Sequence, residues 1–223
     1  PEIFSKAFYI AKSGRPGPVL IDITKDAQFE KFDFSYSKCN GIRSYLPVPQ
    51  INMDMIDSAA EAINNAKKPF IVYGQGVILG EAENDLIKFI EKTGIPSAWT
   101  ILGLSAMPTD HRLNVGMVGM HGNYGPNILT NECDVLVAIG MRFDDRVTGD
   151  LSTYAKQAKI IHLEIDPAEI DKNVKADYPI LGNCKESLSL LLEKVNKNSH
   201  EKWREKFNEL MKIEYEAVIK NDT

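Results

Sequence analysis

An apolar run that ends in glycine and is followed at once by charged side chains constrains this chain more than any other feature. The run covers residues 135–139, Gly140 closes it, and the charged residues that follow are Arg142, Asp144, Asp145 and Arg146. Such a run is typical of a buried strand in a parallel sheet. Because ligands of open parallel sheets lie outside the carboxyl ends of the strands, the pattern predicts a ligand site here. A self-neutralising surface turn is the alternative.

Further apolar runs alternate with helical patterns along the chain. Strands are expected at residues 69–73, 95–100, 159–165 and 180–181, and helices at 54–65, 81–92 and 185–195, with a helical turn at 168–171. Strands that alternate with helices predict an α/β fold, in which a parallel sheet has helices on both faces.

The two ends of the chain depart from this alternation. Residues 3–13 have helical spacing, and residues 19–24 are expected to form a buried strand. The helix expected at residues 200–220 has an apolar stripe with no obvious partner, so we expect it to lead into a further domain. The expected organisation is an end of one domain at 1–25, an ordered linker at 26–49, a central domain at 50–195 and a connecting helix at 196–223.

Composition excludes several classes of protein. The 223 residues are 43% hydrophobic and 26% charged, and the net charge is −5. No apolar run approaches the roughly 20 residues of a membrane span, and no basic run indicates nucleic-acid binding. Three cysteines without metal-ligand spacing favour reduced thiols in a cytoplasmic protein, with Cys133 packed in the core. Because the chain starts at Pro1, we expect a piece of a longer protein.

Glycines follow two of the expected strands. Gly74 and Gly76 would let a dinucleotide approach the backbone, although a tight turn between strand and helix explains them equally well. Four further glycines, ahead of a helix expected from Asn127, would let a planar ligand or a phosphate reach the main chain: Gly116, Gly119, Gly122 and Gly125. His121 lies among them, and hydrogen bonding or packing is its expected role.

Charged side chains supply the remaining candidates. Arg142 and Arg146 have forked donors that suit phosphate or carboxylate, and the aspartates between them are expected to hold them rather than to bind a metal. Glu164 ends a strand where an acid can accept a hydrogen bond from a ribose hydroxyl, and Asp166 before Pro167 is expected to cap a helical turn.

Five segments together resemble the acetolactate synthase (acetohydroxyacid synthase) family, specifically the central domain of the catalytic large subunit. The segments are residues 13–22 (SGRPGPVLID), 74–76 (GQG), 119–122 (GMHG), 140–149 (GMRFDDRVTG) and 164–170 (EIDPAEI). The resemblance runs in order through nearly the whole chain. It implies a central, Rossmann-like FAD-binding domain of a thiamine diphosphate enzyme.

The resemblance also implies a role for each matched residue. Arg146 matches an arginine at the substrate site, where it helps to admit the second 2-ketoacid. The adenosine part of FAD is expected near Glu164, Ile165 and Asp166. Asn183 stands where the family usually has an adenine-side acid, and Tyr124 and Pro126 replace small residues. The other implied FAD contacts are Arg15, Gly74, Gly76, Thr100, Ile101, Leu102, Met120, His121, Gly122, Gly140, Arg142 and Asp144.

For the whole protein, the resemblance implies condensation of two 2-ketoacids with decarboxylation in branched-chain amino acid biosynthesis. Thiamine diphosphate and Mg2+ would be held by amino- and carboxyl-terminal domains that are missing here, so this chain alone is expected to be inactive. A homo-oligomer and a regulatory small subunit are the expected partners, and FAD is expected to be largely structural.

Three alternatives stay open at this point. An NAD-dependent oxidoreductase domain would explain Gly74, Gly76 and Glu164, although the third fingerprint glycine is missing. A related thiamine diphosphate enzyme, such as a pyruvate oxidase or a glyoxylate carboligase, is a further alternative, and the Asp145-Arg146 pair argues against it. A non-catalytic domain that kept the fold and lost its ligand would explain Asn183 and Pro126.

Overall fold

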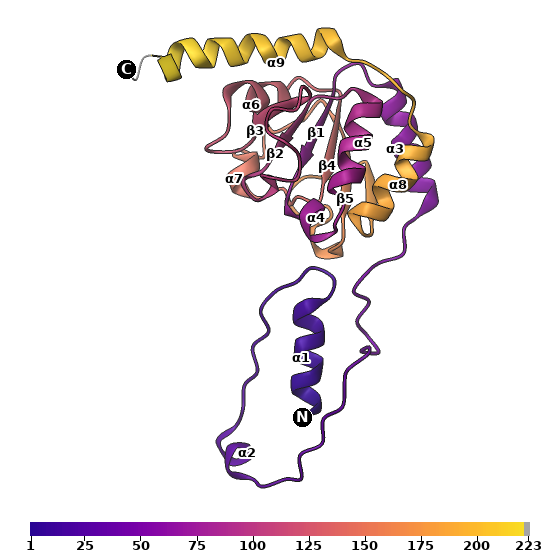
Figure 1. Cartoon of the computed structure of the whole chain (residues 1–223), viewed down its shortest axis with the longest axis vertical. Coiled ribbons are helices and arrows are strands. Elements are labelled where there is room, and N and C mark those ends of the chain that lie inside the picture. The colour runs from indigo at the N-terminus through magenta and orange to yellow at the C-terminus, as the bar shows by residue number, and fades with distance from the viewer. Residues whose placement is uncertain (221–223) are drawn as a thin grey trace. The chain divides into compact units, whose positions relative to one another are not determined.

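A computed structural model describes residues 1–220, without the side chain of Ile219, and divides the chain into two compact units (Figure 1). The first unit is Pro1–Pro49 and the second begins at Gln50. The first unit contains α1 (Glu2–Lys12), α2 (Lys25–Phe29) and extended segments. Tyr9 and Tyr45 meet edge to face at 6.1 Å, and the Tyr45 hydroxyl donates to the Ser13 carbonyl at 3.0 Å, so the later segment is tied back to α1.

The buried strand expected at residues 19–24 does not form. These residues belong to no strand, and Leu20 is 93% exposed. A strand needs a neighbour that accepts and donates its backbone hydrogen bonds, and none of residues 1–220 pairs with this segment. The apolar composition was therefore misleading here.

The second unit contains a parallel sheet with the strand order β3-β2-β1-β4-β5-β6 among the described residues. Its strands are β1 (Pro69–Tyr73), β2 (Ser97–Trp99), β3 (Asn114–Met117), β4 (Val135–Ile139), β5 (Lys159–Glu164) and β6 (Tyr178–Leu181). Every pairing is parallel, and β1 and β4 are the two central strands. The α/β fold predicted from the alternation is confirmed, although the sequence analysis missed β3.

Each central strand is buried on both faces, which explains its continuous apolar sequence. On one face, Ile71 and Tyr73 pack with α3 (Met53–Asn65), α5 (Glu83–Thr93) and α8 (Cys184–Lys194). On the other face, Phe70 and Val72 pack with α6 (Tyr124–Thr130) and α9 (Glu201–Glu214). The shorter helical elements are α4 (Gln75–Leu79), η1 (Ile101–Gly103), α7 (Asp145–Thr148), η2 (Pro167–Glu169) and η3 (Tyr215–Ile219).

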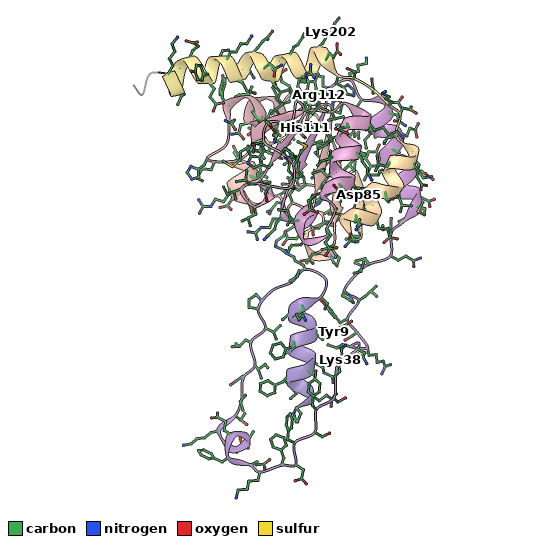
Figure 2. All side chains as sticks on the ribbon, in the orientation of Figure 1. Tyr9, Lys38, Asp85, His111, Arg112 and Lys202 are labelled. Carbon is green, nitrogen blue, oxygen red and sulfur yellow. The ribbon has the colours of Figure 1, made fainter. Side chains whose placement is uncertain are left out.

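The apolar stripe of α9 has a partner, contrary to the expectation from sequence. Trp203 is 4% exposed, and its indole Nε1 donates to the Pro69 carbonyl at 2.9 Å. Phe207 is fully buried, with its ring 5.1 Å from that of Phe70. Lys202 points away from the sheet, on the outer face of the helix (Figure 2). The first part of α9 therefore closes the core, and sequence alone does not reveal this because the contact partners lie far away in the chain.

Among the described residues, no helix has the length and apolar character to cross a membrane.

Candidate functional site

The carboxyl ends of the strands bring the predicted site residues of the second unit to one edge of the sheet. Chain order reverses between β1 and β4, because β1 is followed by strands on one side and β4 by strands on the other. In open α/β sheets this switch point is where a ligand crevice forms. Gly74 and Gly76, at the start of α4 after β1, and Gly140, in the loop after β4, therefore lie at the centre of the edge.

The glycines at the switch point pack against each other. The Gly76 amide donates to the Gly140 carbonyl at 2.8 Å, and a Cβ added at Gly76 would lie 2.6 Å from the Gly140 Cα. Gly140 has φ +55°, a conformation that favours glycine, and a Cβ there would lie 2.7 Å from the Gly76 Cα. The structure shows the tight turn between strand and helix, which packs on the loop after β4; the approach of a dinucleotide to Gly74 and Gly76 stays a prediction.

The end of β2 presents apolar side chains beside this crossing. The Thr100 amide donates to the Tyr73 carbonyl at 2.9 Å, which ties the end of β2 to the end of β1. Thr100 itself is buried, whereas Ile101 is 66% exposed and Leu102 is 60% exposed. Exposed apolar side chains at the carboxyl edge of a sheet are suited to the faces of a planar ligand.

The charged cluster after β4 is organised by one aspartate. Asp144 caps α7, and its carboxylate accepts hydrogen bonds from the amides of Arg146 at 3.1 Å and Val147 at 3.2 Å. The same carboxylate accepts from Nε of Arg142 at 3.0 Å. Asp145 is only loosely paired with Arg146, since Nε and carboxylate are 4.0 Å apart and both side chains are largely exposed. The prediction that the aspartates hold the arginines is therefore confirmed for Arg142 and Asp144.

The loop after β3 meets α7. The Met120 amide donates to the Arg146 carbonyl at 2.7 Å, and Nη1 of Arg146 lies 3.7 Å from the Met120 sulfur. Met120 is 61% exposed, and His121 is exposed beside it. The Gly122 amide donates to the Gly119 carbonyl at 2.9 Å, which closes this turn, and α6 starts at Tyr124 rather than at Asn127.

The ends of β5 and β6 use their polar side chains for local structure. Glu164 is 7% exposed, and its Oε1 accepts from the amides of Ile165 at 2.9 Å and Asp166 at 3.2 Å. Asp166 caps η2 through the Ala168 amide at 3.0 Å, with Pro167 in the first turn, as the sequence predicts. Asn183 caps α8 through the Lys185 amide at 2.8 Å.

Sequence reasoning missed His162, which lies in the middle of β5. The side chain is fully buried, its Nε2 lies 2.9 Å from the Met141 carbonyl oxygen, and its ring is 4.9 Å from the Phe143 ring. Burial lowers the pKa of His162 and outweighs the opposing effects of the hydrogen bond to the Met141 carbonyl and of the charges on Glu169 and Asp171. A histidine inside an apolar strand, between Ile161 and Leu163, was the signal available in the sequence.

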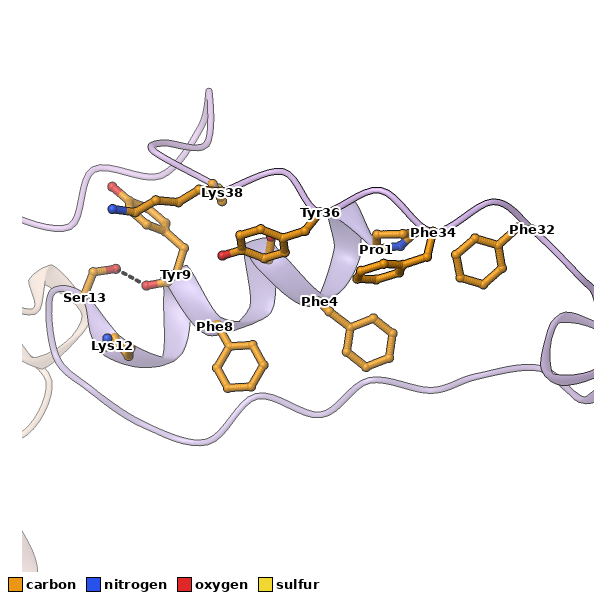
Figure 3. Close-up of a pocket in the computed structure, with 12 residues that line it drawn as sticks. Pro1, Phe4, Phe8, Tyr9, Lys12, Ser13, Phe32, Phe34, Tyr36 and Lys38 are labelled. Carbon is orange, nitrogen blue, oxygen red and sulfur yellow. Dashed lines mark hydrogen bonds between the residues drawn. The ribbon is translucent and has the colours of Figure 1, made fainter.

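Arg15 belongs to the first unit, so its assignment as a flavin contact stays a prediction. That unit also contains an apolar groove of about 570 Å³ along α1 (Figure 3). Aromatic side chains line it, from α1 and from the segment beside it: Phe4, Phe8, Phe32, Phe34 and Tyr36. This lining suits an apolar partner surface better than a phosphate.

No group of three or more His, Cys, Asp or Glu side chains that could hold a metal occurs among the described residues. Cys133 and Cys184 are buried, and burial raises the pKa of each thiol to about 12.

Taken together, the strand order and the loops gathered at the switch point define a doubly wound α/β domain. Comparison with known proteins identifies the family within that class. The model of the thiamine pyrophosphate enzyme central domain matches residues 56–191, and the chain belongs to this family.

Relatives of known name agree with this assignment. The chain is 45% identical over 193 residues to the acetolactate synthase large subunit of Corynebacterium glutamicum, an alignment that covers 86% of this chain and 31% of that protein. It is 44% identical over 219 residues to the probable acetolactate synthase large subunit of Methanocaldococcus jannaschii, with coverage of 96% and 37%. The resemblance to acetolactate synthase large subunits is therefore confirmed, and the chain spans about a third of the length of these relatives.

A solved structure supports the fold independently. A thiamin diphosphate-dependent enzyme from Mycobacterium smegmatis matches with a TM-score of 0.69 at 24% identity, over 89% of this chain and 37% of that chain.

Proposed function

We propose that this chain is the central domain of an acetolactate synthase large subunit and that the carboxyl edge of its sheet binds FAD. The observation that carries the proposal is the combination of exposed apolar side chains and one fixed arginine at the carboxyl edge of the sheet. Ile101, Leu102 and Met120 are each at least 60% exposed, and the Arg142 guanidinium is held by Asp144 at 3.0 Å. A flavin offers apolar ring faces and an anionic diphosphate, so its chemistry fits this set of side chains.

The glycines contribute to this site indirectly. Because Gly76 and Gly140 pack on each other, their backbones set the distance between the loops after β1 and β4. Arg142 follows Gly140 by two residues, and thus the crossing determines where its guanidinium projects. FAD, when bound, would serve mainly as a structural group, as the resemblance implies.

Two observations weigh against NAD as the ligand. In the NAD fingerprint the ribose-binding acid follows the glycines by about 20 residues, at the end of the next strand. Here the strand after Gly74 and Gly76 is β2, which ends at Trp99 and is followed by Thr100. The acid that we considered, Glu164, ends β5 and accepts two backbone amides with Oε1.

In the full-length protein we propose condensation of two 2-ketoacids with loss of carbon dioxide. One 2-ketoacid loses its carboxyl group as carbon dioxide, and the remaining fragment forms a carbon–carbon bond with the carbonyl carbon of the second. Thiamine diphosphate, held with Mg2+ by other domains, would supply the carbanion chemistry. Arg146, which is exposed at 70%, would bind the carboxylate of the second 2-ketoacid. We also propose that the full-length protein forms a homo-oligomer, binds a regulatory small subunit and works in the cytoplasm.

FAD titration tests the binding site. Flavin fluorescence should report saturable binding, and FAD should raise the melting temperature because it binds the folded state. Arg142→Ala should weaken binding about tenfold or more, the usual effect of a charge-assisted hydrogen bond.

The matched control is Arg112→Ala. Arg112 is exposed in the loop that precedes β3, at the amino edge of the sheet (Figure 2). This variant should bind FAD like the unchanged chain. Equal weakening by both variants, or binding of NAD with exclusion of FAD, would contradict the proposal, as would a folded chain that does not bind FAD.

A further inference from the structure

His162 connects two strands beyond the point where their backbone ladder ends. The last ladder bond runs from the Gly140 amide to the Leu163 carbonyl at 2.9 Å. One residue further, the Met141 carbonyl oxygen lies 2.9 Å from Nε2 of His162. Because a carbonyl oxygen only accepts hydrogen bonds, Nε2 carries the proton and donates it. The side chain of His162 thus extends the connection between β4 and β5 by one residue.

The segment after Gly140 alternates between buried and outward-facing residues. Met141 and Phe143 are each 4% exposed and lie in the core on one face of the sheet. His162 contacts both of them, through the Met141 carbonyl and edge-on to the Phe143 ring at 4.9 Å. Arg142 lies between Met141 and Phe143, and Asp144 follows Phe143. Arg142 and Asp144 form the ion pair at the carboxyl edge. Fixing the buried residues therefore sets the direction of the outward ones.

The surroundings of His162 keep its ring neutral. Its Nδ1 is buried and has no hydrogen-bond partner, so protonation there would place an uncompensated N–H in the core. Glu164 has its Oε2 3.9 Å from Nε2, on the side that already donates to Met141. A neutral ring with the proton on Nε2 is the form that matches the Met141 carbonyl.

We propose that His162 is a positioning residue for the flavin site, which acts through the Met141 carbonyl to hold Arg142 and Asp144 at the carboxyl edge. The effect of His162 on FAD binding rests on the proposed function, whereas the contact between His162 and the Met141 carbonyl does not. His162 is fully buried and does not reach the exposed edge, so its role is to position other residues.

Two substitutions separate the donor from the bulk of the side chain. In His162→Gln the amide nitrogen stands as many bonds from Cβ as Nε2 does, so it can donate to Met141. In His162→Asn the amide nitrogen stands where Nδ1 does and cannot reach. We expect His162→Gln to bind FAD within about threefold of the unchanged chain and His162→Asn to bind about tenfold more weakly.

A double-mutant cycle with Arg142→Ala distinguishes positioning from general loss of packing. If His162 acts through Arg142, then Arg142→Ala should weaken FAD binding much less in the His162→Asn chain than in the unchanged chain. Additive effects of the two substitutions would overturn the proposal, as would FAD affinity that His162→Asn leaves unaltered.

Amide hydrogen exchange gives a readout that needs no flavin. His162→Asn should speed exchange at Val147 and Thr148, whose amides the Asp144 cap holds, and His162→Gln should not. Exchange in α5 should stay unchanged in both variants. If the unchanged chain fails to bind FAD, the proposed function falls, and the exchange rates alone then decide this proposal. Equal rates at Val147 in both variants would refute it.

Discussion

Substituting Gly76 by alanine tests whether the glycines at the switch point are there for packing. The added Cβ would lie 2.6 Å from the Gly140 Cα and 2.8 Å from the Gly140 carbonyl oxygen. Carbon atoms in contact normally stand about 3.5–4.0 Å apart, so the two loops would have to separate by roughly 1 Å. Both opposing atoms belong to the backbone, and no side-chain rotation can relieve the clash.

The expected loss of stability follows from three effects. Overpacking costs about 1–3 kcal/mol. Weakening the hydrogen bond from the Gly76 amide to the Gly140 carbonyl, now 2.8 Å long, costs about 1 kcal/mol. Replacing glycine by alanine inside α4 returns about 1 kcal/mol. We therefore expect Gly76→Ala to lower the free energy of unfolding by about 2 kcal/mol.

Urea unfolding, followed by far-ultraviolet circular dichroism, measures this loss against a matched variant. Gly125 also lies in a helix, α6, but a Cβ there would meet its nearest neighbour, the Leu210 Cβ, at 3.4 Å. Gly125→Ala should therefore be neutral or stabilising by up to about 1 kcal/mol. If Gly76→Ala proves as stable as Gly125→Ala, the packing explanation for the glycines is refuted.

Three further predictions concern the core, the buried histidine and the substrate site. Phe207→Ala should lower the free energy of unfolding by about 3–5 kcal/mol, whereas Met211→Ala, 41% exposed on the same helix, should change it by under about 0.5 kcal/mol; equal effects in urea unfolding would contradict the packing of α9. Burial lowers the pKa of His162 below its ordinary value of 6.5, so the unfolded chain binds that proton first as the pH falls. The free energy of unfolding should therefore fall as the pH drops below 6.5, by up to about 1.4 kcal/mol per pH unit. His162→Gln should remove this part of the pH dependence. In the full-length protein, Arg146→Gln should lower kcat/KM for carboligation about 10- to 100-fold and leave FAD affinity unchanged; a loss of FAD instead would assign Arg146 to the flavin site.

The sheet was predictable where apolar runs are continuous. Residues 69–73 and 135–139 were expected as strands and form β1 and β4, because central strands covered on both faces need apolar residues throughout. The edge strand β3 (Asn114–Met117) was missed, since it is short and includes Gly116. Residues 19–24 are also rich in apolar side chains, yet a strand needs a partner as well, which a local pattern does not reveal.

The candidate site was predictable in position but not in its contacts. Residues that follow parallel strands must gather at one edge of the sheet, so the sequence alone predicts that Gly74 and Gly140 lie at the same edge. The crossing of Gly76 and Gly140 depends on contacts between loops far apart in the chain. His162 escaped notice for the same reason, because its role depends on the Met141 carbonyl of a neighbouring strand.

The location of FAD is the central claim, and backbone amide chemical shifts measured during an FAD titration test it most directly. We predict that shifts concentrate at the carboxyl ends of the strands and saturate together, with the largest changes at residues 74–76, 100–102, 120–122 and 140–144. Amides at the amino edge, such as those of Lys68 and Arg112, should stay unchanged. Shifts that gather at the amino edge, or a folded chain whose spectrum FAD does not alter, would contradict the account.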